Sequence, residues 1–146
     1  MNKLFAGLAL ATAMVSSTAA LAAPVKPTVV LVHGAFADSS SWNGVIKILE
    51  KDGYPVISAS NPLRSLKGDA QSVADVLASI KTPIVLVGHS YGGPVISEAA
   101  YGNANVKALV YVAGIAPDTG ESTADLAGRF PGNTLGPTLA PPVELA

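Results

Sequence analysis

A pentapeptide of the pattern Gly-x-Ser-x-Gly carries the clearest chemical signal in this sequence. It reads Gly88-His89-Ser90-Tyr91-Gly92, follows an apolar run at residues 83–87 and opens a segment compatible with a helix. A serine on a sharp turn between a strand and a helix presents its hydroxyl at the carboxyl end of the sheet, where a base can reach it. A side chain at either flanking glycine would collide with the neighbouring strand or helix. The pattern in this context therefore predicts a nucleophilic serine at position 90. The alternative is a serine that serves only as the N-cap of the helix, and an N-cap would need no flanking glycines.

Strands and helices are predicted to alternate around this turn. Four apolar and β-branched runs indicate strands, at residues 28–32, 54–59, 84–87 and 106–113. The first run is continuously apolar, as expected of a parallel strand that is buried on both faces. Apolar residues recur with helical periodicity in the three segments between these runs, at residues 42–49, 73–80 and 90–101. This β-α-β-α-β-α-β succession predicts an α/β fold with a parallel, doubly wound sheet and right-handed crossovers.

The spacing of apolar residues predicts which helix faces pack on the sheet. In the first helix they fall at i, i+3, i+4 and i+7, at Trp42, Val45, Ile46 and Leu49. In the second helix the apolar positions are Val73, Val76, Leu77 and Ile80. The other face of the second helix is expected to carry the polar residues Asp69, Gln71 and Asp75. Both helices are therefore predicted to be amphipathic.

The first 22 residues are predicted to be a secretory signal peptide. Lys3 precedes an apolar stretch at residues 4–15, and Ala20-Leu21-Ala22 fits a cleavage site. A membrane anchor is the lesser alternative, because the apolar stretch is well short of the ~20 residues needed to span a bilayer. We therefore expect an exported protein, periplasmic or secreted, without membrane attachment once the signal is cleaved.

Composition limits the remaining possibilities. The hydrophobic content of 49 % and the charged content of 13 % favour one folded domain over intrinsic disorder. The formal net charge of −1 provides no excess of positive charge to bind nucleic acid or an anionic membrane. The sequence has no cysteine, which excludes disulfides, thiolate zinc sites and a cysteine nucleophile. No ligand cluster or phosphate loop is seen, so neither a metal nor an organic cofactor is expected.

Three stretches together resemble a known family. They are residues 31–36 with Trp42 behind them, the turn at 88–93, and residues 110–121. The chain resembles the amino-terminal half of an α/β-hydrolase, in particular small exported bacterial members related to plant methylesterases and hydroxynitrile lyases. The resemblance implies an incomplete α/β-hydrolase fold with about four strands and three helices, the strands lying in the order second, first, third, fourth. Residues 23–116 would form the partial core. Residues 117–146, rich in proline and glycine, would begin a poorly ordered cap with one short helix at 122–129.

The resemblance also implies roles for particular residues. Ser90 would be the nucleophile, and the backbone N–H groups of Ala35 and Tyr91 would form the oxyanion hole. Of the two histidines in the sequence, His33 is expected to hold the loop after the first strand and His89 to support the turn. Asp118 is a runner-up for the catalytic acid, because some α/β-hydrolases take their acid from the end of the fourth strand.

The implied activity is hydrolysis of a small ester-like molecule. A hydroxynitrile-lyase-like reaction with the same serine is the first alternative, and a non-catalytic remnant or binding module is the second. The family's acid and histidine follow the cap, so we expect the 146-residue chain by itself to be a fragment with little activity. The fourth strand would then be an exposed apolar edge, prone to aggregation. The substrate and the oligomeric state are left open.

Overall fold

The computed structural model describes residues 25–129 and 131–141, so the predicted signal peptide lies outside the described residues. The four strands form a single parallel sheet in the order β2-β1-β3-β4, which confirms the predicted topology. Their bounds are Thr28–Val32 for β1, Val56–Ala59 for β2, Ile84–His89 for β3 and Val106–Val112 for β4.

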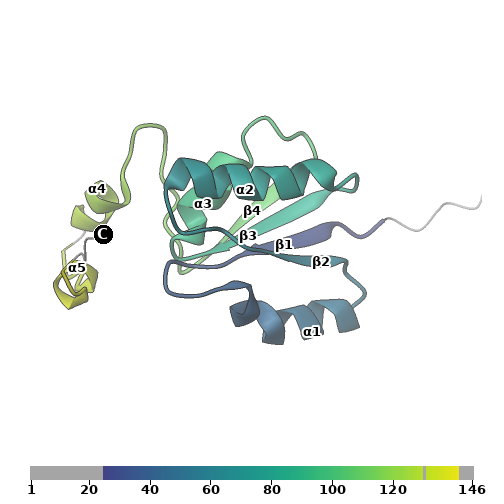
Figure 1. Cartoon of the computed structure of the whole chain (residues 1–146), viewed down its shortest axis with the longest axis horizontal. Helices are drawn as coiled ribbons and strands as arrows, with labels where there is room; N and C mark the ends of the chain where they lie inside the picture. The colour runs from purple at the N-terminus through teal and green to yellow at the C-terminus, as the bar shows by residue number, and fades with distance from the viewer. Residues whose placement is uncertain (1–24, 130, 142–146) are drawn as a thin grey trace, which may run out of the picture.

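Helices cover both faces of this sheet, as a doubly wound fold requires. Helix α2 (Leu66–Ser79) and helix α3 (Gly92–Ala99) lie on one face, and α1 (Asn43–Lys51) lies on the other (Figure 1). All five residues of β1 are buried, and their side chains alternate between two apolar clusters. Val30 and Val32 join the cluster under α2 and α3, whereas Val29 and Leu31 pack with Trp42. This central strand carries the loop that reaches the candidate site.

Helix α1 is less buried than its sequence pattern predicts. A short 3-10 turn, Ser39–Trp42, precedes it, and Trp42 at the end of that turn is buried. No residue within α1 is buried, and Val45 and Ile48 are 39 % and 62 % exposed. The helix contacts the core only through half-buried Ile46 and Leu49.

Helix α2 corrects the prediction for Asp69. The helix begins earlier than the periodicity indicated, with the Ser65 side chain accepting a hydrogen bond from the Gly68 N–H as its N-cap. Asp69 is fully buried, not exposed on a polar face. Its spacing explains this, because a residue four and eight positions before Val73 and Leu77 shares their face of the helix. The carboxylate is tolerated there because a distant side chain satisfies it, as described below.

Strand β4 lies at the edge of the sheet, as expected. It pairs with β3 along its length and has no second neighbour among the described residues. Leu109, Val110 and Val112 are between 36 % and 41 % exposed. The sheet therefore presents an apolar border on this side.

The segment after β4 contains two short helices apart from the sheet layers (Figure 1). Helix α4 (Thr123–Gly128) matches the predicted short helix, whereas α5 (Leu135–Thr138) was not predicted. A capping box between Ser122 and Asp125 begins α4. Within the described residues, no helix is both long and apolar enough to cross a membrane.

Candidate active site

Ser90 lies in the turn between β3 and α3, in a backbone conformation that non-glycine residues rarely adopt. Its φ is +52°, in the left-handed region. The turn is held from both sides: the Ser90 N–H donates to the Val112 carbonyl at 3.2 Å, and the Ser90 carbonyl accepts from the Gly93 N–H at 2.9 Å. The hydroxyl is accessible to solvent and makes no hydrogen bond within the described residues. The strained turn thus presents an unengaged hydroxyl at the carboxyl end of the central strands.

The glycines around Ser90 allow backbone segments to touch, as the sequence predicted. A Cβ added at Gly88 would lie 2.6 Å from the carbonyl carbon of Gly92, on the first turn of α3. A Cβ added at Gly92 would lie 2.7 Å from the carbonyl oxygen of Val32, at the end of β1. At Gly93 it would come within 3.0 Å of the Ile115 backbone. A side chain at Gly88 or Gly92 would push α3 away from the strands that support the turn, and one at Gly93 would push it away from the segment after β4.

The loop after β1 packs directly against Ser90. A Cβ added at Gly34 would lie 3.1 Å from the Ser90 Cβ and 3.0 Å from the His89 Nδ1. The next residue, Ala35, lines the same hollow as Tyr91. In the described part of the chain, the backbone N–H groups of Ala35 and Tyr91 donate no hydrogen bond to a protein acceptor. Two such donors beside an accessible serine can stabilise an oxyanion, and the positive amino-terminal end of α3 favours the same charge.

His33 is a structural residue, as expected. It is 2 % exposed, and both ring nitrogens are engaged. Nε2 accepts from the Asn61 N–H at 3.2 Å, so Nδ1 carries the proton and donates to the Gly34 carbonyl at 2.9 Å. The Asn61 side chain donates back to the His33 carbonyl at 3.1 Å. His33 thereby ties the loop after β1 to the loop after β2 and has no free nitrogen to act as a base.

His89 precedes Ser90 directly in the sequence, but its ring packs against that of Trp42. The two rings are perpendicular, with centroids 6.4 Å apart. No hydrogen bond joins the His89 ring to the Ser90 hydroxyl among the described residues. The buried Trp42 N–H also finds no partner within the described residues. Neither histidine is therefore placed to take the Ser90 proton.

Asp118 is engaged in its own turn. Its carboxylate accepts from the Thr119 N–H at 2.7 Å, and its own N–H donates to the Glu121 carboxylate at 2.9 Å. It lines a hollow together with Glu98 and Tyr101, residues of the outer end of α3 and its continuation. No hydrogen bond joins Asp118 to Ser90 among the described residues, and the contacts of Asp118 fit an ordinary turn.

Asp69 was not predicted to lie at the site, yet its carboxylate binds the residue after Ser90. The Tyr91 O–H donates to Asp69 Oδ2 at 2.7 Å, and the Arg64 backbone N–H donates to Oδ1 at 3.1 Å. Burial raises the pKa of the Tyr91 phenol to about 12, and the hydrogen bond to Asp69 and its negative charge act in the same direction. The helical spacing of Asp69 with Val73 and Leu77 was the signal that could have placed this carboxylate inside.

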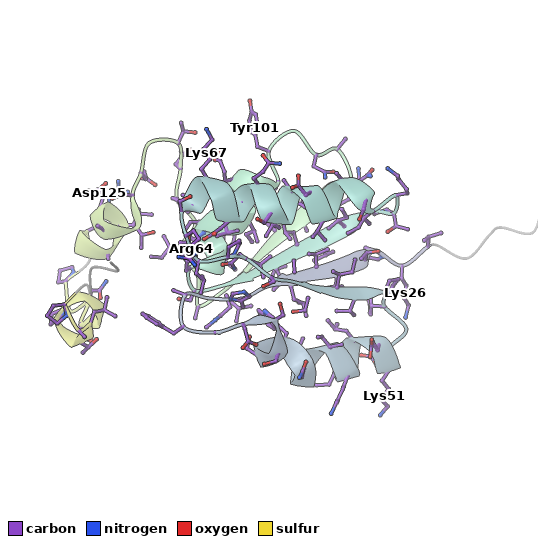
Figure 2. All side chains as sticks on the ribbon, in the orientation of Figure 1. Lys26, Lys51, Arg64, Lys67, Tyr101 and Asp125 are labelled. Atoms are coloured by element: carbon purple, nitrogen blue, oxygen red, sulfur yellow. The ribbon has the colours of Figure 1, made fainter. Side chains whose placement is uncertain are left out.

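A hollow of about 310 Å³ adjoins the serine turn. Its lining consists of Ala35, Leu63, Arg64, Ser65 and Tyr91. Figure 2 shows Arg64 at the left end of the sheet, where the strands pass into their following loops. Among the described residues, no group of three histidine, cysteine or acidic side chains could hold a metal ion. This place offers a hydroxyl, backbone amides and a small hollow with both apolar and polar lining residues.

These features define a class: a doubly wound parallel sheet with a serine on the turn between a central strand and its helix. The model of the alpha/beta hydrolase family matches residues 29–145. The chain belongs to the alpha/beta hydrolase family.

Individual relatives agree with this assignment. The chain is 32 % identical over 106 residues to a carbendazim hydrolyzing esterase from Nocardioides sp., covering 64 % of this chain and 44 % of that protein. It is 30 % identical over 111 residues to putative methylesterase 11 of Arabidopsis thaliana, covering 66 % of this chain and 28 % of that protein. Among solved structures, an extracellular alpha/beta-hydrolase from a Paenibacillus species matches with a TM-score of 0.62 and 26 % identity, covering 76 % of this chain and 49 % of that one. The chain spans about half the length of these relatives or less.

Proposed function

We propose that this chain is the nucleophile-bearing part of a serine hydrolase that cleaves small carboxylic esters. The observation that carries the proposal is Ser90 itself, held at a φ of +52° with its hydroxyl accessible beside two unengaged amides. The related carbendazim esterase and putative methylesterase support an ester as the substrate class.

The proposed reaction follows from this geometry. Ser90 Oγ attacks the ester carbonyl carbon while its proton passes to a base, and the resulting oxyanion accepts hydrogen bonds from the Ala35 and Tyr91 N–H groups. Collapse of this intermediate expels the alcohol and leaves an acyl group on Ser90, which water then removes in a second step.

The base and the acid are proposed to come from a part of the enzyme that this chain does not supply. His33 is engaged at both nitrogens, His89 contacts Trp42, and the chain spans about half of its relatives. Removing the base from a serine hydrolase costs on the order of 10⁶ in turnover. The chain alone is therefore proposed to hydrolyse esters very slowly, although Ser90 keeps its strained turn and the neighbouring backbone amides.

Export is proposed from residues 1–22, with a periplasmic or secreted location. A charged start, an apolar stretch and a small-residue cleavage site support it. The Paenibacillus relative is itself described as extracellular.

The proposal is tested by covalent labelling of the purified chain with an alkyl fluorophosphonate, with imidazole added as an external base. Intact mass and peptide mapping would report where the phosphonyl group resides. We expect one label on Ser90 and none in Ser90→Ala. Ser79→Ala is the matched control, because Ser79 is an exposed helical serine whose hydroxyl bonds to its own helix at Val76. Labelling spread over surface serines, or unchanged in Ser90→Ala, would overturn the proposal.

A further inference from the structure

Asp69 is a fully buried carboxylate on a helix face that otherwise packs apolar side chains. Ala70, Val73 and Leu77 on the same helix are buried with it. Burying a carboxylate is unfavourable unless its oxygens are hydrogen-bonded. Here each oxygen has one partner, and the two partners belong to different segments of the site.

One partner fastens the loop between β2 and α2. The Arg64 N–H binds Oδ1 at 3.1 Å, while the other end of this loop is fastened at Asn61 by His33. Between these two points Leu63 has a φ of +56°, a conformation that a non-glycine residue keeps only where its surroundings hold it. The loop is thus clamped at both ends in a strained shape.

The other partner fastens the serine turn. The Tyr91 O–H binds Oδ2 at 2.7 Å, so the ring is held at its far end while its backbone N–H lies next to Ser90. Tyr91 and the loop residues Leu63, Arg64 and Ser65 all line the hollow of about 310 Å³. One carboxylate therefore connects two walls of the hollow beside the nucleophile.

We propose that Asp69 is a positioning residue of the active site: it fixes the Tyr91 ring and the Arg64 backbone so that the hollow stays open for one substituent of the substrate carbonyl. By holding the Tyr91 side chain, it also fixes the direction of the Tyr91 N–H toward the developing oxyanion. This positioning role rests on the proposed function of Ser90. The two hydrogen bonds of Asp69 are features of the structure and do not depend on that function.

Replacing Asp69 by asparagine changes the network in a defined way. The Arg64 N–H can only donate, so the asparagine oxygen must face it and the asparagine NH₂ must face Tyr91. The phenol then accepts a hydrogen bond where it formerly donated one, and a donor beside the phenol favours the phenolate. The Tyr91 pKa should therefore fall below about 12, because the negative charge and the accepting hydrogen bond of Asp69 are removed, while burial still holds it above its ordinary value.

The test compares Asp69→Asn with Asp75→Asn. Asp75 lies on the same helix and binds only the exposed Gln71 side chain, so the charge change is identical but remote from the site. Tyrosine ionisation is read as the difference in ultraviolet absorbance at about pH 11 after a rapid pH jump, with Tyr91→Phe added to Asp69→Asn identifying the Tyr91 contribution. Ser90 labelling by the fluorophosphonate is measured on the same variants, and circular dichroism checks that each is folded.

We expect Asp69→Asn to increase the ionised fraction of Tyr91 at that pH and to slow Ser90 labelling about tenfold or more, since small displacements in an active site cost that much. Tyr91→Phe should slow labelling similarly, which keeps the test valid if Asp69→Asn does not fold. Asp75→Asn should change neither property. Unchanged labelling in a folded Asp69→Asn or Tyr91→Phe variant would overturn the positioning role, and unchanged Tyr91 ionisation would overturn the hydrogen bond itself. If Ser90 of the unmodified chain takes no label, the proposed function fails and the positioning role with it, while the titration still reports the bond.

Discussion

Adding one methyl group at Gly88 tests the packing of the serine turn. The new Cβ would lie 2.6 Å from the Gly92 carbonyl carbon, whereas ordinary contacts there are 3.4–4 Å. The first turn of α3 would therefore have to move by about 1 Å against strands it already touches, in an interior with little free space. Overpacking of this kind costs about 1–3 kcal/mol and more where the obstacle is backbone. We expect Gly88→Ala to lower the free energy of unfolding by about 3 kcal/mol.

Gly44→Ala is the matched control for this substitution. Gly44 lies in the exposed first turn of α1, and a Cβ there meets nothing within 4 Å. Alanine in a helix is favoured over glycine by about 0.8–1.0 kcal/mol, so this variant should be slightly more stable. Urea unfolding followed by the fluorescence of Trp42, the single tryptophan, measures both variants. If Gly88→Ala is as stable as the unmodified chain, the close packing of β3 on α3 is refuted.

Three further predictions concern other parts of the molecule. Ser90→Gly should raise the free energy of unfolding by about 1 kcal/mol because glycine relieves the left-handed strain, while phosphonate labelling disappears; a less stable glycine variant in urea unfolding would contradict the strain. Val110→Lys, on the exposed edge strand β4, should increase the monomer fraction in sedimentation velocity, and unchanged association would argue against β4 as the contact. The hydrogen bonds from Ser122 hold the pKa of Asp125 below its usual 3.8. The capping box therefore stabilises α4 at pH values above the usual pKa of Asp125, and it should open as the pH falls through the lowered pKa. A change in the NMR chemical shift of the Ser122 amide over this pH range would report the opening, and Asp125→Asn should show no such change.

Local patterns predicted the part of the structure that short segments determine. The β1 run was continuously apolar, and the structure buries it on both faces with the predicted bounds of residues 28–32. The glycines at the serine turn predicted a close approach of backbones, which the contacts at Gly88 and Gly92 confirm. In both cases the constraint lies within a few residues of the position that it affects.

Contacts between distant segments were beyond such patterns. The partners of Asp69 come from a loop and from a turn 22 residues away, and no pattern within the helix predicts the hydrogen bond to the Tyr91 hydroxyl. The bond from Asn61 to His33 spans 28 residues in the same way. Val45 shares the predicted apolar face of α1 but is 39 % exposed, since Ile46 and Leu49 are the α1 side chains that pack against the core. Each outcome depends on which elements become neighbours in the fold.

A crystal structure of the chain after reaction with an alkyl fluorophosphonate tests the central claim most directly. We expect phosphorus bonded to Ser90 Oγ, with one phosphoryl oxygen about 2.7–3.1 Å from the backbone nitrogens of both Ala35 and Tyr91. An adduct on a different side chain, or a phosphoryl oxygen turned to solvent away from those two nitrogens, would contradict it.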